Sequence, residues 1–176
     1  MEKLPFEKIE RETLVKKEAS TNESYGKKPE QRTTKELLDN GVICLNKLSG
    51  PSSHQVADYV KRILNAEKVG HGGTLDTGVK GVLQISLGRA TKVMEALLKS
   101  GKEYVCLMHI HTPIQQSKIH KIIKEFIGKI TQMPPVKSAV KRVLREREIY
   151  YLEILEIKDQ DVLFRVGCQA GTYIRT

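Results

Sequence analysis

The polar and apolar positions divide the chain into a charged leader and a body with regular apolar patterns. Residues 1–40 carry many charges and few apolar residues, and Pro5, Gly26 and Pro29 would interrupt any long helix. We therefore expect residues 1–40 to be an N-terminal extension that becomes ordered only against a partner. The body, residues 41–176, alternates short apolar runs with amphipathic stretches, which is typical of a folded domain.

The body mixes strand patterns with helix patterns. Strands are expected at 41–46, 81–87, 103–111, 148–157 and 162–169, the first of them as a buried strand. Helices are expected after an N-capping turn at 50–53, over about 90–100, over 119–127, and from 171 onward. The apolar face of the helix after the 50–53 turn would comprise Val56, Tyr59, Val60, Ile63 and Leu64. The hairpin at 158–161 and the mixture of elements predict an α+β fold with a mostly antiparallel sheet.

Charge narrows the class of partner. The formal net charge is +9 and the sequence pI is about 9.4. The leader holds nine Lys/Arg and nine Asp/Glu, so the whole excess lies in residues 41–176. A basic body of this kind favours a polyanionic partner, first of all nucleic acid, over a protein that is merely basic.

Cysteine usage and hydropathy indicate a compartment. The three cysteines, Cys44, Cys106 and Cys168, lie in apolar runs and form no C-x-x-C pair, which favours reduced core thiols over metal ligands. No apolar run opens the chain as a signal peptide would, and none approaches the roughly 20 residues of a membrane span. We therefore expect a cytoplasmic protein without membrane contact.

One acidic residue stands in a glycine-rich loop, residues 70–78, where Asp76 follows three glycines. The loop is not a Walker A motif, because Val79 stands where the lysine is needed. It is not a dinucleotide fingerprint either, because Leu75 replaces the third glycine. The glycines then serve unusual backbone dihedrals or the close approach of another backbone, such as a nucleic-acid strand.

The surroundings of Asp76 exclude two further chemistries. Glycoside hydrolysis normally needs a pair of carboxylates, and no second acid is nearby. His71 and Asp76 lack the spacing of metal ligands, while His109 and His111 lack a third ligand and fit ordinary strand histidines. Two interpretations of Asp76 remain at this point, a turn-forming residue and a functional acid.

Five segments resemble, in order, the motifs of the TruB/dyskerin family of pseudouridine synthases. The segment HGGTLD at 71–76 is similar to the catalytic motif of that family. The other four are GVICLNK at 41–47, GKEY at 101–104, PPVKSAVK at 134–141 and GTYIR at 171–175. The leader, through LPFE at 4–7 and GKKP at 26–29, resembles the archaeal guide-RNA-dependent branch.

The resemblance implies an isomerase that converts uridine to pseudouridine in rRNA or tRNA. It implies the catalytic-domain fold of that family, with residues 41–176 as its N-terminal part, without the rest of that domain and without a PUA domain. It also implies work in an H/ACA ribonucleoprotein with guide RNA and small partner proteins. No metal or organic cofactor takes part in this chemistry.

The resemblance also assigns residues to roles. Asp76 is the catalytic aspartate, acting as nucleophile or as the base that removes a sugar proton. Tyr104 stacks on the flipped base, Arg175 pairs with Asp76, and Tyr173 lies beside them. Lys47 supports the loop rather than reacting. The substrate side is expected to comprise Lys47, His71, Gly73, Thr74, Lys137, Lys141 and Arg142, the last three in a basic run on the RNA backbone.

Two departures from the family pattern keep an alternative open. Thr77 replaces the proline that follows the catalytic aspartate, and the segment 46–48, Asn-Lys-Leu, replaces Asp-Lys-Pro. Both changes remove rigidity near the site. The alternative is a catalytically inactive fragment that acts only as an RNA- or RNP-binding module, and a basic ribosome-associated protein is a third possibility.

Overall fold

The protein is described from a computed structural model that covers residues 2–20, 22–136 and 140–175. The chain divides into two compact units. We call Thr13–Leu98 the loop unit, because it contains the glycine-rich loop, and Met1–Glu12 with Lys99–Thr176 the hairpin unit. Each unit is described by itself. Within the described parts of the chain, no helix combines the length and the apolar character needed to cross a bilayer.

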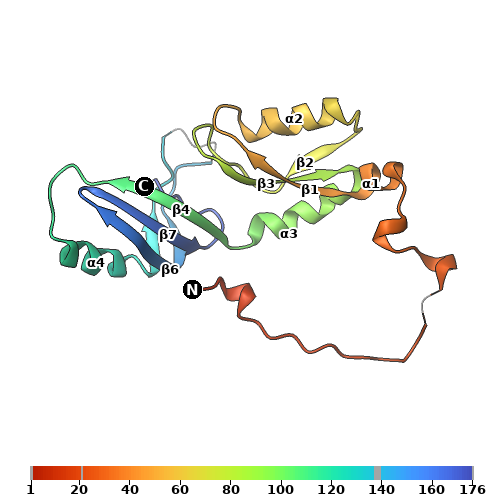
Figure 1. Ribbon diagram of the computed structural model, residues 1–176, viewed down its shortest axis with the longest axis horizontal. Helices are drawn as coiled ribbons and strands as arrows, with labels where there is room; N and C mark the ends of the chain where they lie inside the picture. The colour runs from red at the N-terminus through yellow and green to blue at the C-terminus, as the bar shows by residue number, and fades with distance from the viewer. Residues whose placement is uncertain (1, 21, 137–139, 176) are drawn as a thin grey trace. The chain divides into compact units, whose positions relative to one another are not determined.

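The loop unit is built on a three-stranded antiparallel sheet with strand order β1-β3-β2 (Figure 1). The strands are β1 (Val42–Lys47), β2 (Val69–His71) and β3 (Gly81–Leu87). The helices are α1 (Thr34–Asn40), α2 (Ser53–Ile63) and α3 (Met94–Lys99), the last preceded by the 3₁₀ segment Gly88–Val93. Residues 72–80 connect β2 to the central strand β3, and these two strands pair with each other in the sheet.

The core of the loop unit lies between β3 and α2, and it confirms the predicted helix after residue 53. Leu83, Ile85 and Leu87 from β3 are buried together with Val60 from α2. Ser52 caps α2, because its hydroxyl accepts from the Gln55 N–H while the Gln55 side chain binds the Ser52 N–H.

The apolar face predicted for α2 is too wide, because Tyr59 and Ile63 remain exposed. This helix covers a sheet of only three strands, so one narrow stripe of side chains suffices to bury the sheet face.

The first strand also differs from expectation. Strand β1 was expected to be buried, but its residues alternate between exposed and half-buried positions until Lys47. Ile43 and Leu45 pack against the core with one face of this antiparallel sheet, so the side chains on the opposite face of β1 meet water. The interpretation of all three cysteines as core thiols is accordingly wrong for Cys44, which is exposed, whereas Cys106 is half-buried and Cys168 is buried.

The leader contains more local structure than its composition predicts. Thr33 caps α1 through a reciprocal pair of bonds with Glu36, and short 3₁₀ turns lie at Pro5–Glu7, Glu23–Tyr25 and Pro29–Gln31. Near the N-terminus, Leu4 is only 7% exposed within the hairpin unit. The amide of Glu2 donates to Glu153, and Arg165 donates to the Glu2 carbonyl, so the first residues bind the sheet of that unit.

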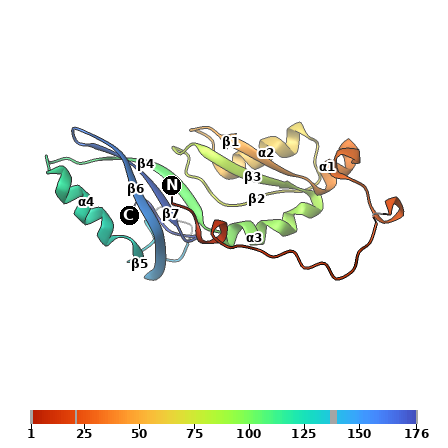
Figure 2. The same cartoon turned by 60° about the horizontal axis from the view of Figure 1, so that its bottom comes forward.

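The hairpin unit contains a four-stranded antiparallel sheet with strand order β4-β7-β6-β5 (Figure 2). Its strands are β4 (Lys102–His109), β5 (Gly128–Gln132), β6 (Arg145–Lys158) and β7 (Asp161–Cys168). Helix α4 (Gln116–Glu125) covers one face, where Ile119 and Ile123 bury Val162. The predicted hairpin between the two long strands is confirmed, with Asp159 at φ 53° in the turn. The expectation of an α+β fold with a mostly antiparallel sheet is confirmed as well.

The expected helix from residue 171 is not formed. Residues 170–175 make turns instead. Gly171 has φ +80°, a left-handed conformation that does not continue into an α-helix, and Thr172 closes a turn onto the Gln169 carbonyl. The side chain of Gln132 binds both backbone polar groups of Tyr173, at 2.9 and 3.1 Å, and so holds this segment against β5.

Candidate active site

The glycine-rich loop, residues 70–78, includes the end of β2 and most of the connection from β2 to β3, and it carries Asp76 in an exposed position. Its first arm lies tightly on β3: the Gly72 N–H donates to the Gln84 carbonyl at 2.8 Å, and a Cβ on Gly72 would lie 2.6 Å from the Gln84 side chain. Gly73 has φ +147°, which any residue with a side chain rarely adopts. Glycine is therefore favoured at 73 by the backbone conformation, whereas a side chain at 72 would displace the end of the Gln84 side chain.

Lys47, at the end of β1, holds the second arm of the loop. Its side chain is only 2% exposed, and its ammonium Nζ donates to the carbonyls of Leu48, Asp76 and Val79 at 3.0, 3.0 and 2.9 Å. A buried ammonium needs such partners, and carbonyl oxygens supply them. Lys47 therefore binds the loop backbone, and its lack of a part in the reaction stays a prediction.

His71, the last residue of β2, holds the first arm. Its Nδ1 lies 2.8 Å from the Gly73 carbonyl oxygen, which can only accept, so Nδ1 carries the proton and Nε2 is the acceptor of the neutral ring. Burial lowers the pKa of His71 below its ordinary value; the Gly73 carbonyl raises that pKa, and the charge of His54 lowers it. His71 is thus a neutral ring at neutral pH.

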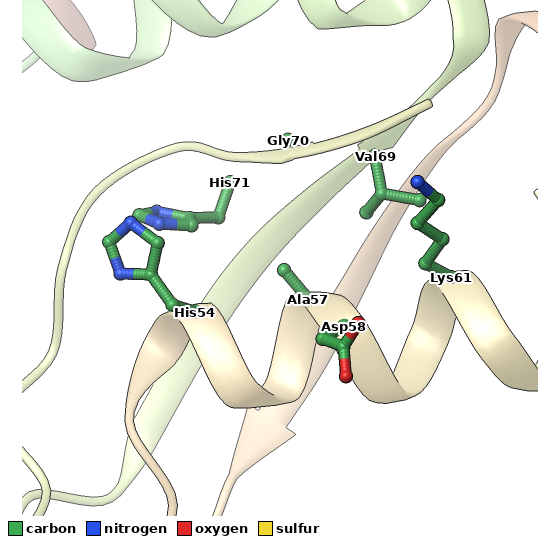
Figure 3. Close-up of a pocket in the computed structure, with 7 residues that line it drawn as sticks. All are labelled: His54, Ala57, Asp58, Lys61, Val69, Gly70 and His71. Carbon is green, nitrogen blue, oxygen red and sulfur yellow. The ribbon is translucent and has the colours of Figure 1, made fainter. Parts of the chain in front are cut away.

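His54 on α2 lies against His71, and together they line one end of a shallow pocket (Figure 3). The two ring centroids are 4.7 Å apart in an edge-to-face arrangement, with an interplanar angle of 85°. The pocket has a volume of about 380 Å³ and lies between α2 and β2, with Lys61 and Val69 at its other end. Its walls combine two imidazoles, small apolar groups, the carboxylate of Asp58 and the ammonium of Lys61.

The remaining predicted catalytic residues lie in the hairpin unit. Tyr104 on β4 is half-buried and packs against the cluster of Ile149, Val166 and Cys168. Tyr173 is fixed through its backbone by Gln132, as described above, while Arg175 is exposed. Because Asp76 belongs to the loop unit, its pairing with Arg175 and the placement of Tyr104 beside it stay predictions.

The predicted basic run is only partly covered by the structure. Lys137 lies outside the described residues. Lys141 and Arg142 are exposed, and the Arg142 Nε donates to the Pro134 carbonyl at 3.2 Å, which directs this side chain back along its own segment. Further along, the Arg147 Nε donates to the Gly171 carbonyl at 3.2 Å. The run therefore mixes exposed cations with cations that tie the segment to its neighbours.

Two histidines weighed as metal ligands have other partners. His109 pairs with Asp161 at 2.7 Å and lies edge-on to His111, with 5.2 Å between ring centroids. Among the described residues, no three His, Cys, Asp or Glu side chains are grouped so as to hold a metal ion.

Sequence reasoning missed Ser53. It is completely buried, and its hydroxyl binds both backbone polar groups of Leu75, the residue before Asp76. The only signal in the sequence was the Ser52-Ser53 pair, which indicated a helix cap and nothing about the loop. Asp76 is thus an exposed carboxylate on a backbone that is held from several sides.

The chain was compared with protein families and with known proteins. Residues 61–174 match the family described as TruB family pseudouridylate synthase (N terminal domain), and residues 1–57 match the DKCLD (NUC011) domain. The chain is 55% identical to the probable tRNA pseudouridine synthase B of Pyrococcus furiosus, over 96% of this chain and 50% of the relative. It is 51% identical to the protein of that name from Methanopyrus kandleri, over 98% and 51%.

Solved structures agree with these matches. A Cbf5-Nop10-Gar1 complex contains a chain that aligns with a TM-score of 0.89 and 55% identity, over 98% of this chain and 52% of that one. An H/ACA RNP bound to a substrate RNA containing 2'-deoxyuridine aligns with a TM-score of 0.85 and 50% identity, over 96% and 50%. The chain spans about half the length of the relatives that it matches. With a family model covering most of the body and the glycine-rich loop inside it, the chain belongs to the TruB family of pseudouridylate synthases.

Proposed function

We propose that this protein isomerises uridine to pseudouridine in rRNA or tRNA, as the catalytic subunit of an archaeal H/ACA guide RNP. The observation that carries the proposal is the presentation of Asp76: an exposed carboxylate on a loop whose backbone is bound by the buried ammonium of Lys47. A turn-forming aspartate would need no such support. Its relatives are named as pseudouridine synthases, and its structural neighbours include an H/ACA RNP with substrate RNA.

The reaction explains why one carboxylate is enough. The bond between N1 of uracil and the sugar C1′ breaks, the base turns, and C5 joins C1′; the C5 proton leaves to solvent and N1 regains a proton. Asp76 acts as nucleophile or removes a sugar proton in this sequence. The base is kept rather than expelled to water, so the second acid of a glycoside hydrolase has no task.

The other residues then take supporting roles. The target nucleotide leaves its stack at a cost of a few kcal/mol, and Tyr104 stacks on the flipped base, which is worth roughly 1–3 kcal/mol. Arg175 pairs with Asp76, and Tyr173 lies beside them. His71, Gly73 and Thr74 face the substrate, while Lys137, Lys141 and Arg142 contact the RNA backbone.

The wider assignment follows from the same proposal. Residues 1–40 form an extension, and residues 41–176 form the N-terminal part of the catalytic domain. The partners are guide RNA, the target rRNA or tRNA, and the H/ACA proteins, in the cytoplasm. The chemistry supplied by Asp76 requires no cofactor.

Release of tritium from RNA labelled at C5 of uridine tests the proposal, because C5 loses its hydrogen only when the isomerisation occurs. The chain is assayed as its full-length gene product, reconstituted with guide RNA and the H/ACA proteins. Asp76→Asn is expected to lower the rate at least about 10³-fold, whereas Asp39→Asn, which changes an exposed acid of the same unit, leaves it within about twofold. Undiminished release by Asp76→Asn would overturn the mechanism. RNA binding without any release by the unaltered protein would leave the binding-module alternative.

A further inference from the structure

Ser53 is a buried hydroxyl whose two hydrogen bonds both go to the catalytic loop. It is the first residue of α2, directly after the N-cap Ser52, and it is 0% exposed. Its Oγ accepts from the Leu75 N–H at 2.9 Å and donates to the Leu75 carbonyl at 3.2 Å. A hydroxyl has one donor and two acceptor sites, so both bonds can form at once.

These two bonds act at the residue next to the proposed catalytic acid. Leu75 immediately precedes Asp76, and its side chain packs against the core of β3 and α2. Directly after this point, the Asp76 carbonyl binds the Lys47 ammonium at 3.0 Å. The backbone that carries the Asp76 side chain is therefore held on its N-terminal side by α2 and on its C-terminal side by β1.

The next residue of α2 contacts the other arm of the loop. The His54 ring lies edge-on to His71, and His71 in turn donates to the Gly73 carbonyl at 2.8 Å (Figure 3). The first turn of α2 thus reaches the loop at two places, before and after its glycines. A helix packed into the core of the unit is a rigid base for such contacts.

We propose that Ser53 is a positioning residue for Asp76. By binding both backbone groups of Leu75 to the first turn of α2, it sets the position and the direction of the Asp76 carboxylate. The inference rests on the proposed function, since only an acid that reacts must be placed so accurately. A displacement of about 1 Å at a reacting group costs about 10²-fold in rate. A clamp of the backbone should therefore influence turnover much more than RNA binding.

The test compares Ser53→Ala with the unaltered protein in the reconstituted tritium-release assay. We expect kcat to fall about tenfold or more while KM for RNA stays within about twofold, because the loop shifts but the RNA-binding surface does not. Independently of activity, we expect hydrogen exchange at the Leu75 amide to accelerate, since this amide loses its acceptor.

Thr33→Ala is the matched control. Thr33 caps α1 in the same unit with a hydroxyl that accepts from the Glu36 N–H, so its loss also removes a hydroxyl bond to the backbone and weakens a helix, without touching the loop. It should leave kcat within about twofold and the Leu75 amide protected. Equal kcat for the two variants, measured where both are folded by circular dichroism, or unchanged exchange at Leu75 in Ser53→Ala, would overturn the inference. Failure of the proposed function itself looks different: either the unaltered protein releases no tritium, or Asp76→Asn keeps full activity.

Discussion

At the scale of single residues, the position of Asp76 depends on two side chains that bind the loop backbone, those of Lys47 and Ser53. Lys47 brings a charge into a buried position, which is costly unless the charge is fully solvated by protein groups. The carbonyls of Asp76 and Val79 in the loop region do this, together with the carbonyl of Leu48. The ammonium thereby ties the loop backbone to the end of β1 on both sides of Thr77.

The pH dependence of His71 is a prediction at this scale. Its pKa in the folded protein is lowered, mainly by burial, below the 6.5 of an ordinary histidine. The unfolded chain therefore takes up the proton first as the pH falls, so the contribution of a neutral His71 to stability is complete above pH 6.5 and is lost between 6.5 and its lower folded value. An NMR titration should give the His71 ring a midpoint below 6.5.

Its control is the neighbouring ring. His54→Ala removes a charge that lowers the pKa of His71 and also opens its surroundings to water, so the midpoint should move upward. A His71 midpoint at or above 6.5 in the unaltered protein would contradict the lowering of its pKa by burial.

At the scale of elements, the hairpin unit depends on one glycine in β7. Gly167 lies opposite Tyr151 of β6, and the Tyr151 ring occupies the space above it. The Tyr151 hydroxyl donates to Glu103 of β4, and burial, followed by this bond, raises the pKa of Tyr151 well above its ordinary value. The three strands are thus linked on one sheet face through a side chain that only a missing Cβ admits.

Gly167→Ala should therefore destabilise the protein. The added methyl group would meet the Tyr151 ring, and moving the ring also breaks the bond to Glu103, so we expect a loss of about 1–3 kcal/mol in the free energy of unfolding. Urea unfolding followed by circular dichroism measures it. Gly78→Ala is the control, since nothing lies within 4 Å of the Cβ position there and its φ is not in the left-handed region. Equal stability of the two variants would show that the ring adapts without cost.

The elements also show where sequence patterns succeed. The hairpin of β6 and β7 was predictable because both strands alternate around a polar turn, and α2 because a cap precedes an apolar stripe. The helix expected from residue 171 is not formed: Gly171 is in the left-handed region, and the Gln132 side chain, about forty residues earlier in the chain, binds the backbone of Tyr173. Local periodicity contains no information about such a partner.

At the scale of the whole molecule, the charge distribution predicts how RNA binding responds to salt. The net charge of +9 lies entirely in residues 41–176. Lys141 and Arg142 are two exposed cations of that part of the chain. If each neutralises one phosphate, changing both to alanine should reduce the slope of log Kd against log salt by about 1.4, at about 0.7 per contact with single-stranded RNA.

Fluorescence anisotropy over a series of salt concentrations measures this slope. The matched control is the pair Lys118→Ala and Lys121→Ala on α4, which removes the same charge from exposed positions outside the proposed RNA surface. An identical loss of slope in the two double variants would mean that overall charge, and not the basic run, determines binding.

The sequence by itself determined the chemistry that the protein can offer: one acid in a glycine loop, a basic body, and a family pattern that includes both. These are properties of residue type and spacing, which need no folded chain. Only the tertiary structure decided how the acid is held, through Lys47 reaching Asp76 across 29 positions and Ser53 reaching Leu75 across 22. It also decided that Cys44 meets water and that the residues from Gly171 onward do not form the expected helix. The physical reason is the same in each case: a backbone group takes whichever partner the packed chain brings within 3 Å, and that partner is set by topology rather than by its neighbours in sequence.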